Sequence, residues 1–300
     1  MSPARTDPPA GALAGTGTSA GDTPAGVAIT ARDPCFDLSG PLAGDWHGGD
    51  PFRTAFFNAL SITFPIGERF FIDSVRAFEP DVADARLRAQ VLAFIGQEAR
   101  HRREHQRYNE TLCAARGYDL ERLEGGQRER TRWAGENLSR FRWLTATVAY
   151  EHLTAVIADG ILRDPRWLAG ADPTMAALWR WHAIEETEHK AVAFDVYRAV
   201  GGREADRRAM LRIATLQLLR DVLAGTRHML AVAGLGRSPR RWLGGMSYLL
   251  GTRGILLPLA RHWRAYRRPG FHPWERDNRD VLARWSRPLG TATIGPSGPS

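Results

Sequence analysis

Six glutamate and histidine residues, spread over four separate stretches of the chain, have the types and the spacing of metal ligands. Two of these stretches carry the pattern Glu-x-x-His, in which a step of three residues places both side chains on one face of a helix. The other two stretches each contribute a single glutamate. The six positions are Glu68, Glu98, His101, Glu151, Glu186 and His189. Four carboxylates and two imidazoles are enough donors to hold and bridge two cations.

The order of these residues is more informative than the Glu-x-x-His pattern, which is short enough to recur by chance. Glu98 follows Glu68 by 30 residues and Glu186 follows Glu151 by 35, and each separation fits two antiparallel helices joined by a turn. The 53 residues between Glu98 and Glu151 leave room for a long crossover. The same ligand arrangement occurs in the di-iron and di-manganese sites of ferritin-like bundles. The sequence therefore predicts an all-α, ferritin-like four-helix bundle with a di-metal site and additional C-terminal helices.

Helical periodicity surrounds every one of these ligands. The apolar rows predict four helices, over residues 65–78, 83–116, 140–162 and 173–200. Each row is interrupted by an ionisable group, which is costly to bury unless something compensates its charge, as a metal ion does. In the alternative interpretation, the histidines are core residues and the carboxylates form buried salt bridges or face solvent. We expect the neighbouring glutamates to face solvent or to pair with arginine, namely Glu104, Glu110, Glu185 and Glu188.

Three further polar side chains extend the ligand rows. His105 lies four residues after His101, and His182 lies four residues before Glu186, so each continues its row by one helical turn. Either histidine would bind a metal directly or form a hydrogen bond to a ligand as a member of the surrounding shell. Tyr108 lies a further turn beyond His105, where it would deliver protons or electrons or act as a core aromatic residue.

Composition separates the bundle from its flanks. Residues 1–50 are rich in glycine and proline and predict a disordered N-terminal tail, residues 51–202 hold the four-helix core, and residues 288–300 predict a second disordered tail. The two cysteines, Cys35 and Cys113, are too few for a disulfide framework. No apolar secretory segment follows the N-terminus, so we expect a cytoplasmic protein.

Residues 203–287 predict a basic, apolar helical extension. The chain has a net charge of +8, yet residues 201–300 alone hold 18 arginines against six acidic residues. The apolar stretches 209–235 and 242–260 are interrupted by charges and by proline, so neither predicts a clean membrane span. This extension either packs on the bundle with a solvated basic face or lies peripherally on the anionic inner face of the membrane. No nucleic-acid-binding motif accompanies the arginines.

Several segments of the chain resemble a bacterial family of predicted metal-dependent hydrolases over about residues 50–285. The resemblance rests on the segments FPIGERFF from Phe64, FIGQEARH from Phe94 with the following His105 and Tyr108, and YEH from Tyr150, and on WHAIEETEHK from Trp181 and PGFHPW from Pro269. It implies a shared metal site and a C-terminal Phe-His-Pro-Trp element, in which we expect His272 to be a structural corner. No family pattern is broken at the six ligand positions.

The chemistry of the donor set leaves three functions open. Hard oxygen donors suit two metal ions, with iron favoured and manganese or zinc as alternatives. We expect an oxygen-activating oxidase or oxygenase that acts on a small hydrophobic or lipid-like substrate and takes electrons from a separate donor. The alternative is a hydrolase that uses metal-activated water, and the third possibility is an iron-binding or structural bundle. The sequence lacks His-Glu-x-x-His, Gly-x-Ser-x-Gly and nucleotide-binding glycine motifs, and it does not indicate the oligomeric state.

Overall fold

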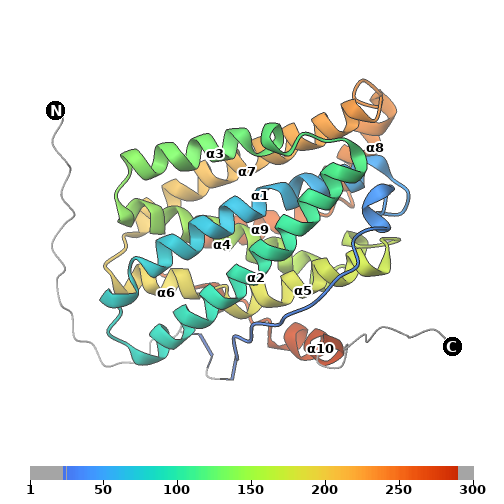
Figure 1. Cartoon of the computed structure of the whole chain (residues 1–300). Helices are drawn as coiled ribbons and strands as arrows, with labels where there is room; N and C mark the ends of the chain where they lie inside the picture. Colours follow the sequence, from blue (N-terminus) through green and yellow to red (C-terminus); the bar gives the residue numbers. More distant parts are fainter. Residues whose placement is uncertain (1–22, 25, 290–300) are drawn as a thin grey trace.

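Four helices provide the framework of the fold. The computed structural model describes residues 23–24 and 26–289, without the side chains of 286–289. Within this part of the chain the regular structure is helical, and no strand is formed. The four helices that carry the candidate ligands are α1 (Pro51–Arg76), α2 (Ala85–Arg116), α4 (Arg140–Arg163) and α5 (Pro173–His189). Helix α1 packs on α2, and α4 packs on α5 (Figure 1). The prediction of an all-α bundle is confirmed.

Local sequence signals fix where these helices begin and end. The side chains of Asp50, Asp84, Ser139 and Asp172 each accept a hydrogen bond from a backbone N–H in the first turn of the helix that follows. Such caps satisfy donors that have no partner inside the helix. Helix α2 ends at Gly117, whose φ of 67° is accessible at little cost to glycine. The observed α2 and α4 therefore lie close to the predicted ranges 83–116 and 140–162.

The predicted start of the first helix at Pro65 is wrong, because α1 begins at Pro51 and continues through the proline. Proline has no N–H, so the carbonyl of Ser61, four residues earlier, loses its helical partner. The side-chain amide of Asn109 on α2 donates to this carbonyl at 3.1 Å. A neighbouring helix thus replaces the missing bond, and α1 continues toward Glu68.

The fourth predicted helix, residues 173–200, is divided in the structure. Helix α5 ends at His189, and a separate helix, α6 (Val192–Ala199), follows after a short turn. The ammonium group of Lys190 in this turn is buried and donates to the backbone carbonyl of Arg276 at 2.7 Å and to Oδ1 of Asn278 at 2.6 Å. The turn is therefore tied to the segment that precedes α10 (Arg279–Leu289).

The remaining helices cover the bundle. Helix α3 (Leu120–Asn137) lies within the long connection between Glu98 and Glu151 and packs on α1, while α7 (Glu204–Val232) packs on α1 and α4 (Figure 1). The chain continues through α8 (Pro239–Leu250) and α9 (Ala260–Tyr266). Across the described residues, no helix has both the length and the apolar character required to span a membrane.

The N-terminal segment differs from the predicted tail of residues 1–50. Residues 1–22 and 25 lie outside the described part of the chain, but residues 26–50 pack along the bundle. Leu38, Leu42 and Trp46 are buried among the core side chains, and Nε1 of Trp46 donates to Oδ1 of Asn58 at 2.9 Å. Few large apolar residues in this segment are enough to anchor it, because each is buried against a preformed helical surface. At the other end, residues 288–289 belong to α10, and residues 290–300 of the predicted tail lie outside the description.

Candidate metal centre

The structure brings together all six side chains whose spacing predicts metal binding. Helix α1 contributes Glu68, α2 contributes Glu98 and His101, α4 contributes Glu151, and α5 contributes Glu186 and His189. All six are buried. Their donor atoms fall into overlapping groups, two of which are Glu68, Glu98 and His101, and Glu98, Glu151 and His189. Within each group the donor atoms lie within 4.8 Å of one another, close enough to surround one cation.

Two of the carboxylates lie between the two histidines. Oε1 of Glu98 is 3.4 Å from Nδ1 of His101 and 3.2 Å from Nε2 of His189. Oε1 of Glu186 lies 3.5 and 3.6 Å from the same two nitrogens. Glu98 and Glu186 thus each lie close to both histidines. Glu68 lies in the group that contains His101, and Glu151 in the group that contains His189.

Every one of the six candidate ligands has at least one buried polar atom that lacks a hydrogen-bond partner among the described residues. The unpaired atoms are both carboxylate oxygens of Glu68, Glu98 and Glu151, Oε2 of Glu186, Nδ1 of His101 and Nε2 of His189. Burying a polar atom without a partner costs about 1–3 kcal/mol, and more for a charged group. So many orphaned donors at one place fit a set of ligands for a divalent metal, whose charge would compensate them.

The opposite nitrogen of each histidine is hydrogen bonded, and this fixes the ring. Nε2 of His101 lies 3.1 Å from Oε2 of Glu185, and Nδ1 of His189 lies 2.8 Å from Oε1 of Gln97. Both partners are acceptors, so each histidine donates outward and turns its other ring nitrogen toward the carboxylates. The two helices exchange this support, because Gln97 on α2 holds a histidine of α5 and Glu185 on α5 holds a histidine of α2.

A third layer of contacts fixes these partners. The guanidinium of Arg32, in the N-terminal segment, donates to Oε1 of Glu185 at 3.3 Å and to Oε1 of Glu188 at 2.6 Å. Nε2 of Gln97 donates to Oε2 of Glu188 at 2.8 Å. The expectation that Glu185 and Glu188 face solvent is wrong, since both are buried; the other expectation, pairing with arginine, is confirmed.

Sequence reasoning did not identify these supporting residues as part of the site. Gln97 and Glu185 each precede a ligand by one position, and one residue corresponds to about 100° around a helix, which normally places a side chain on another face. Their common position before a Glu-x-x-His pattern is a signal that comparison of the two patterns reveals. Arg32 carries no comparable signal, because its role depends on where the N-terminal segment packs.

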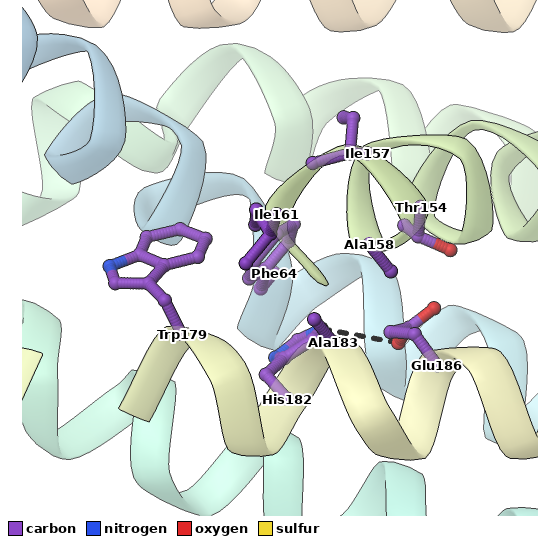
Figure 2. A pocket seen from close by; sticks show the side chains of 9 residues that line it. All are labelled: Phe64, Thr154, Ile157, Ala158, Ile161, Trp179, His182, Ala183 and Glu186. Carbon is purple, nitrogen blue, oxygen red and sulfur yellow. Dashed lines mark ion pairs between the residues drawn. The ribbon is translucent and has the colours of Figure 1, made fainter. Parts of the chain in front are cut away.

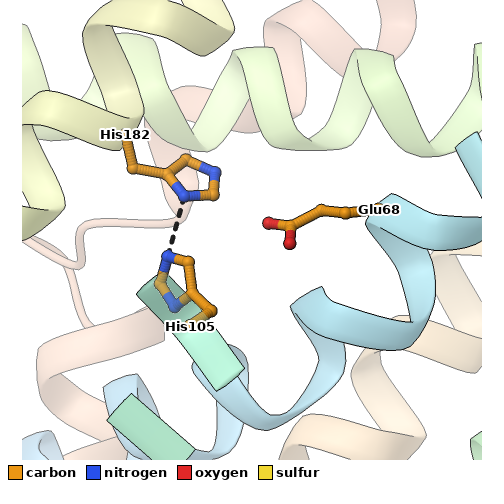
Figure 3. A group of neighbouring side chains, drawn as sticks. All are labelled: Glu68, His105 and His182. Atoms are coloured by element: carbon orange, nitrogen blue, oxygen red, sulfur yellow. Dashed lines mark hydrogen bonds between the residues drawn. The ribbon is translucent and has the colours of Figure 1, made fainter. Parts of the chain in front are cut away.

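His105 and His182 lie at one end of the cluster and form a hydrogen-bonded chain. Oγ of Ser61 donates to Oδ1 of Asn109 at 2.8 Å and lies 2.8 Å from Nδ1 of His105. Nε2 of His105 lies 2.8 Å from Nδ1 of His182, and Figure 3 shows this pair facing the carboxylate of Glu68. The donor atoms of Glu68, His105 and His182 also form a group within 4.8 Å. Nε2 of His182 is 3.1 Å from Oε1 of Glu186.

Tyr108 lies in the core beside this chain rather than among the candidate ligands. Its hydroxyl donates to Oδ1 of Asn58 at 2.6 Å, the same oxygen that accepts from Trp46. Burial raises the pKa of Tyr108 well above its usual range. The structure therefore favours the core-aromatic interpretation over proton or electron delivery.

The electrostatics of the cluster reflect its crowded carboxylates. Burial and repulsion between neighbouring carboxylates raise the pKa of Glu68 and of Glu151 well above the usual range, and burial also raises the pKa of Glu98. Burial acts on Glu186 in the same direction, but the neighbouring histidines outweigh it and hold the pKa of this residue well below its usual range. Without a cation, protons must limit the repulsion in this buried group.

A narrow apolar pocket lies between α4 and α5 and borders the cluster. Figure 2 shows its lining, which consists of Phe64, Thr154, Ile157, Ala158, Ile161, Trp179, His182, Ala183 and Glu186. Most of these side chains are hydrocarbon or aromatic. The polar atoms of His182 and Glu186 lie on the side that faces the candidate metal ligands, so the pocket joins an apolar lining to a polar end.

The Phe-His-Pro-Trp element lies outside the cluster. Nε2 of His272 is 2.9 Å from Oδ1 of Asp195, and Nδ1 of the same ring accepts a hydrogen bond from the backbone N–H of Trp274. The ring therefore holds a corner between α6 and the segment before α10, in agreement with its predicted structural role.

Comparison with known proteins gives one family match. A family model described as predicted metal-dependent hydrolase matches residues 30–277, which include all six candidate ligands, His105 and His182. Neither the curated proteins nor the solved structures contain a match to the chain.

Proposed function

The chain belongs to the family of predicted metal-dependent hydrolases, and we propose that it is a hydrolase with two metal ions held by the six-residue cluster. The observation that carries the proposal is the set of orphaned donor atoms, which occurs on all six predicted ligands. Glu98 and Glu186 would bridge the two ions. His101 and Glu68 would complete one site. His189 and Glu151 would complete the other.

When bound, two such ions activate water and polarise a carbonyl or phosphoryl oxygen. The contribution of the chain is to hold the ligands in place before the ions bind. Glu185 and Gln97 keep the two histidine rings oriented, and Arg32 holds Glu185 in turn. Fixed ligands of this kind reduce the reorganisation that accompanies the reaction.

We also propose that His182 is a third nitrogen ligand rather than only a hydrogen-bonding neighbour. The single hydroxyl proton of Ser61 goes to Asn109, so Ser61 must accept from Nδ1 of His105. Nε2 of a neutral His105 is then an acceptor for Nδ1–H of His182. This polarity leaves a lone pair on Nε2 of His182, which faces Oε1 of Glu186 at 3.1 Å.

The pKa directions agree with a neutral histidine pair. Burial lowers the pKa of His105 well below its usual range and lowers that of His182 to about 4. The lone pairs on Nε2 of His182 and on Oε1 of Glu186 face each other in a buried site, and they repel unless a proton or a cation lies between them. His105 then acts as a positioning residue that selects the tautomer of His182.

The lining of the pocket matches a small hydrophobic or lipid-like substrate in polarity only, because its volume of about 10 Å³ has room for little more than one water molecule and the pocket would have to widen. Phe64, Ile161 and Trp179 would receive an apolar group, while the bond to be hydrolysed would lie at the end formed by His182 and Glu186. Burial of apolar surface at about 25 cal/mol per Å² would supply the binding energy without a charged anchor.

An oxygen-activating oxidase or oxygenase is the second candidate, and the donor set is the observation that favours it. Four carboxylates and two to three imidazoles suit iron as well as manganese or zinc. Such an enzyme would need a separate electron donor. The family match favours hydrolysis over this alternative.

Metal content and reactivity, measured on one preparation, distinguish the two functions. Purified protein would be depleted of metal, reloaded separately with Fe²⁺, Mn²⁺ or Zn²⁺, and assayed without oxygen on p-nitrophenyl esters of increasing acyl length and on p-nitrophenyl phosphate. The proposal predicts anaerobic hydrolysis by the loaded protein that Glu151→Gln reduces and Glu110→Gln does not. Oxygen consumption by the reduced iron form, without hydrolysis of any ester, would contradict the hydrolase and favour the oxygenase.

A further inference from the structure

Exposed apolar side chains are concentrated in one stretch of the chain. Of the eleven large apolar residues that are exposed in the described part of the chain, nine lie between residues 213 and 257. The two outside this stretch are Leu92 and Trp133. Apolar residues scattered singly over a surface are ordinary, whereas nine within one stretch of the chain make the helices of that stretch a candidate contact surface.

Helix α7 carries the first part of this group along one face. Ile213, Leu216, Arg220, Leu223 and Arg227 follow one another at three- and four-residue steps, and all five are exposed. The opposite face packs on α1, where a Cβ atom at Gly225 would lie 2.9 Å from Cβ of Ala59. The exposed row of α7 is therefore the side that points away from the bundle.

Helix α8 continues the same surface. Its inner side packs on α1 through Gly245, which lies directly against the ring of Phe52. Its outer side exposes Leu243, Met246 and Leu250, with Arg240 and Arg241 at its first turn. Because α7 and α8 both turn one side toward α1, each leaves its other side exposed. We call these exposed side chains of the two helices the α7–α8 face.

The charge of this region has one sign. Nine arginines and a single acidic residue lie between residues 212 and 264. That acid, Asp221, is half-buried and forms an ion pair with Arg130 of α3. No other acidic residue between 212 and 264 is therefore present to neutralise the arginines of the α7–α8 face.

We propose that the α7–α8 face docks onto an anionic lipid bilayer. Leucines exposed as fully as Leu216 (69%) and Leu243 (71%) would enter the boundary between headgroups and acyl chains, and the arginines beside them would contact lipid phosphates. Each arginine near an anionic surface contributes about 1 kcal/mol. A second copy of the chain fits this face less well, because it would place arginine rows of the same sign against each other. The inference goes beyond the proposed function and does not depend on the metal centre.

Vesicle sedimentation tests the proposal on the full-length protein. The protein would be mixed with phosphatidylcholine vesicles with and without phosphatidylglycerol, at low and at high salt. The expected result is sedimentation with the anionic vesicles only, weakened by salt because ionic screening shortens the range of the attraction. R220Q/R227Q should weaken binding about tenfold or more, since two arginine contacts are lost.

Two further variants separate docking from misfolding. L216Q/L223Q/L243Q should also lose vesicle binding, whereas Leu92→Gln, a substitution at an equally exposed leucine (61%) outside the face, should bind as the unmodified protein does. Metal content and circular dichroism of each variant establish that the bundle is intact. Failure to sediment with anionic vesicles would overturn the proposal. So would sedimentation that the face variants leave unchanged, or a dimer that only the face variants dissociate in the ultracentrifuge.

Discussion

The candidate ligands are held by their neighbours as firmly as by their own helices. His101 and His189 each use one ring nitrogen for an outward hydrogen bond and direct the other at the carboxylates. The outward partner of His101 is Glu185, which is bound by Arg32 of the N-terminal segment. Removing the partner of a ligating histidine typically costs 10–100-fold in metal affinity.

The first prediction concerns this support. Arg32→Ala leaves two buried carboxylates, Glu185 and Glu188, without their cation, so the affinity of the protein for metal should fall by about 10–100-fold. Competition against a metal chelator measures the change. Arg69→Ala is the matched control, because Arg69 forms an exposed ion pair with Asp73 and should leave the affinity unaltered. Equal affinities in the two variants would show that Arg32 does not support the site.

A second prediction at the residue scale concerns protons. Burial and carboxylate repulsion raise the pKa of Glu68 and Glu151, so these groups keep protons at a pH where an ordinary glutamate has lost them. Metal binding requires the carboxylate form and must therefore release protons. The apparent affinity should rise with pH, and calorimetry in buffers of different ionisation enthalpy should detect the released protons. Binding that is independent of pH and buffer would contradict this account.

At the scale of the elements, the accuracy of sequence-based prediction depended on whether the signal was local. Helix α2 was predicted almost to its ends because its cap at Gly117 and its periodic row are both part of the helix. The start of α1 was missed because Asn109, on another helix, satisfies the carbonyl of Ser61 that Pro65 leaves free. Spacing was enough to predict that the six candidate ligands lie together. Their supporting partners depend on contacts between helices, which spacing alone does not reveal.

The attachment of α8 to α1 gives a prediction at this scale. A methyl group at Gly245 would overlap the ring of Phe52, so Gly245→Ala should lower the free energy of unfolding by about 1–3 kcal/mol. At the neighbouring Gly244 no atom lies within 4 Å of the added Cβ. Gly244→Ala should therefore raise the free energy of unfolding by about 0.5–1 kcal/mol, because alanine is the better helix former. Chemical denaturation measures the free energy of unfolding of both variants. A change of the same sign in the two would show that α8 does not pack as described.

At the scale of the whole molecule, the N-terminal segment belongs to the folded unit. Deletion of residues 1–45 removes Leu38, Leu42 and Arg32, so it should cost several kcal/mol of stability through lost apolar burial and unpaired carboxylates. A second truncation that removes only residues 1–22 serves as the comparison. The difference in melting temperature between the two truncated proteins then gives the contribution of residues 23–45 to stability. Equal melting temperatures would contradict the packing of this segment.

The distribution of charge gives the molecule two distinct regions. A buried cluster of carboxylates occupies the bundle, and a surface rich in arginine and leucine covers α7 and α8. Composition predicted the basic extension, because net charge is additive along the chain. Which leucines remain exposed was set by the packing of both helices on α1, so this surface became visible only in the fold.

The most direct test of the central claim is the number of metal ions bound per chain. Metal-depleted protein would be reloaded with Fe²⁺, Mn²⁺ or Zn²⁺, freed of excess metal and analysed by mass spectrometry, alongside Glu98→Ala, Glu186→Ala and the exposed control Glu110→Ala. Two ions are expected in the unmodified protein and the control, and one or none in each ligand variant, because Glu98 and Glu186 lie beside both histidines. Two ions retained by both ligand variants, or no metal bound by the unmodified protein, would contradict this expectation.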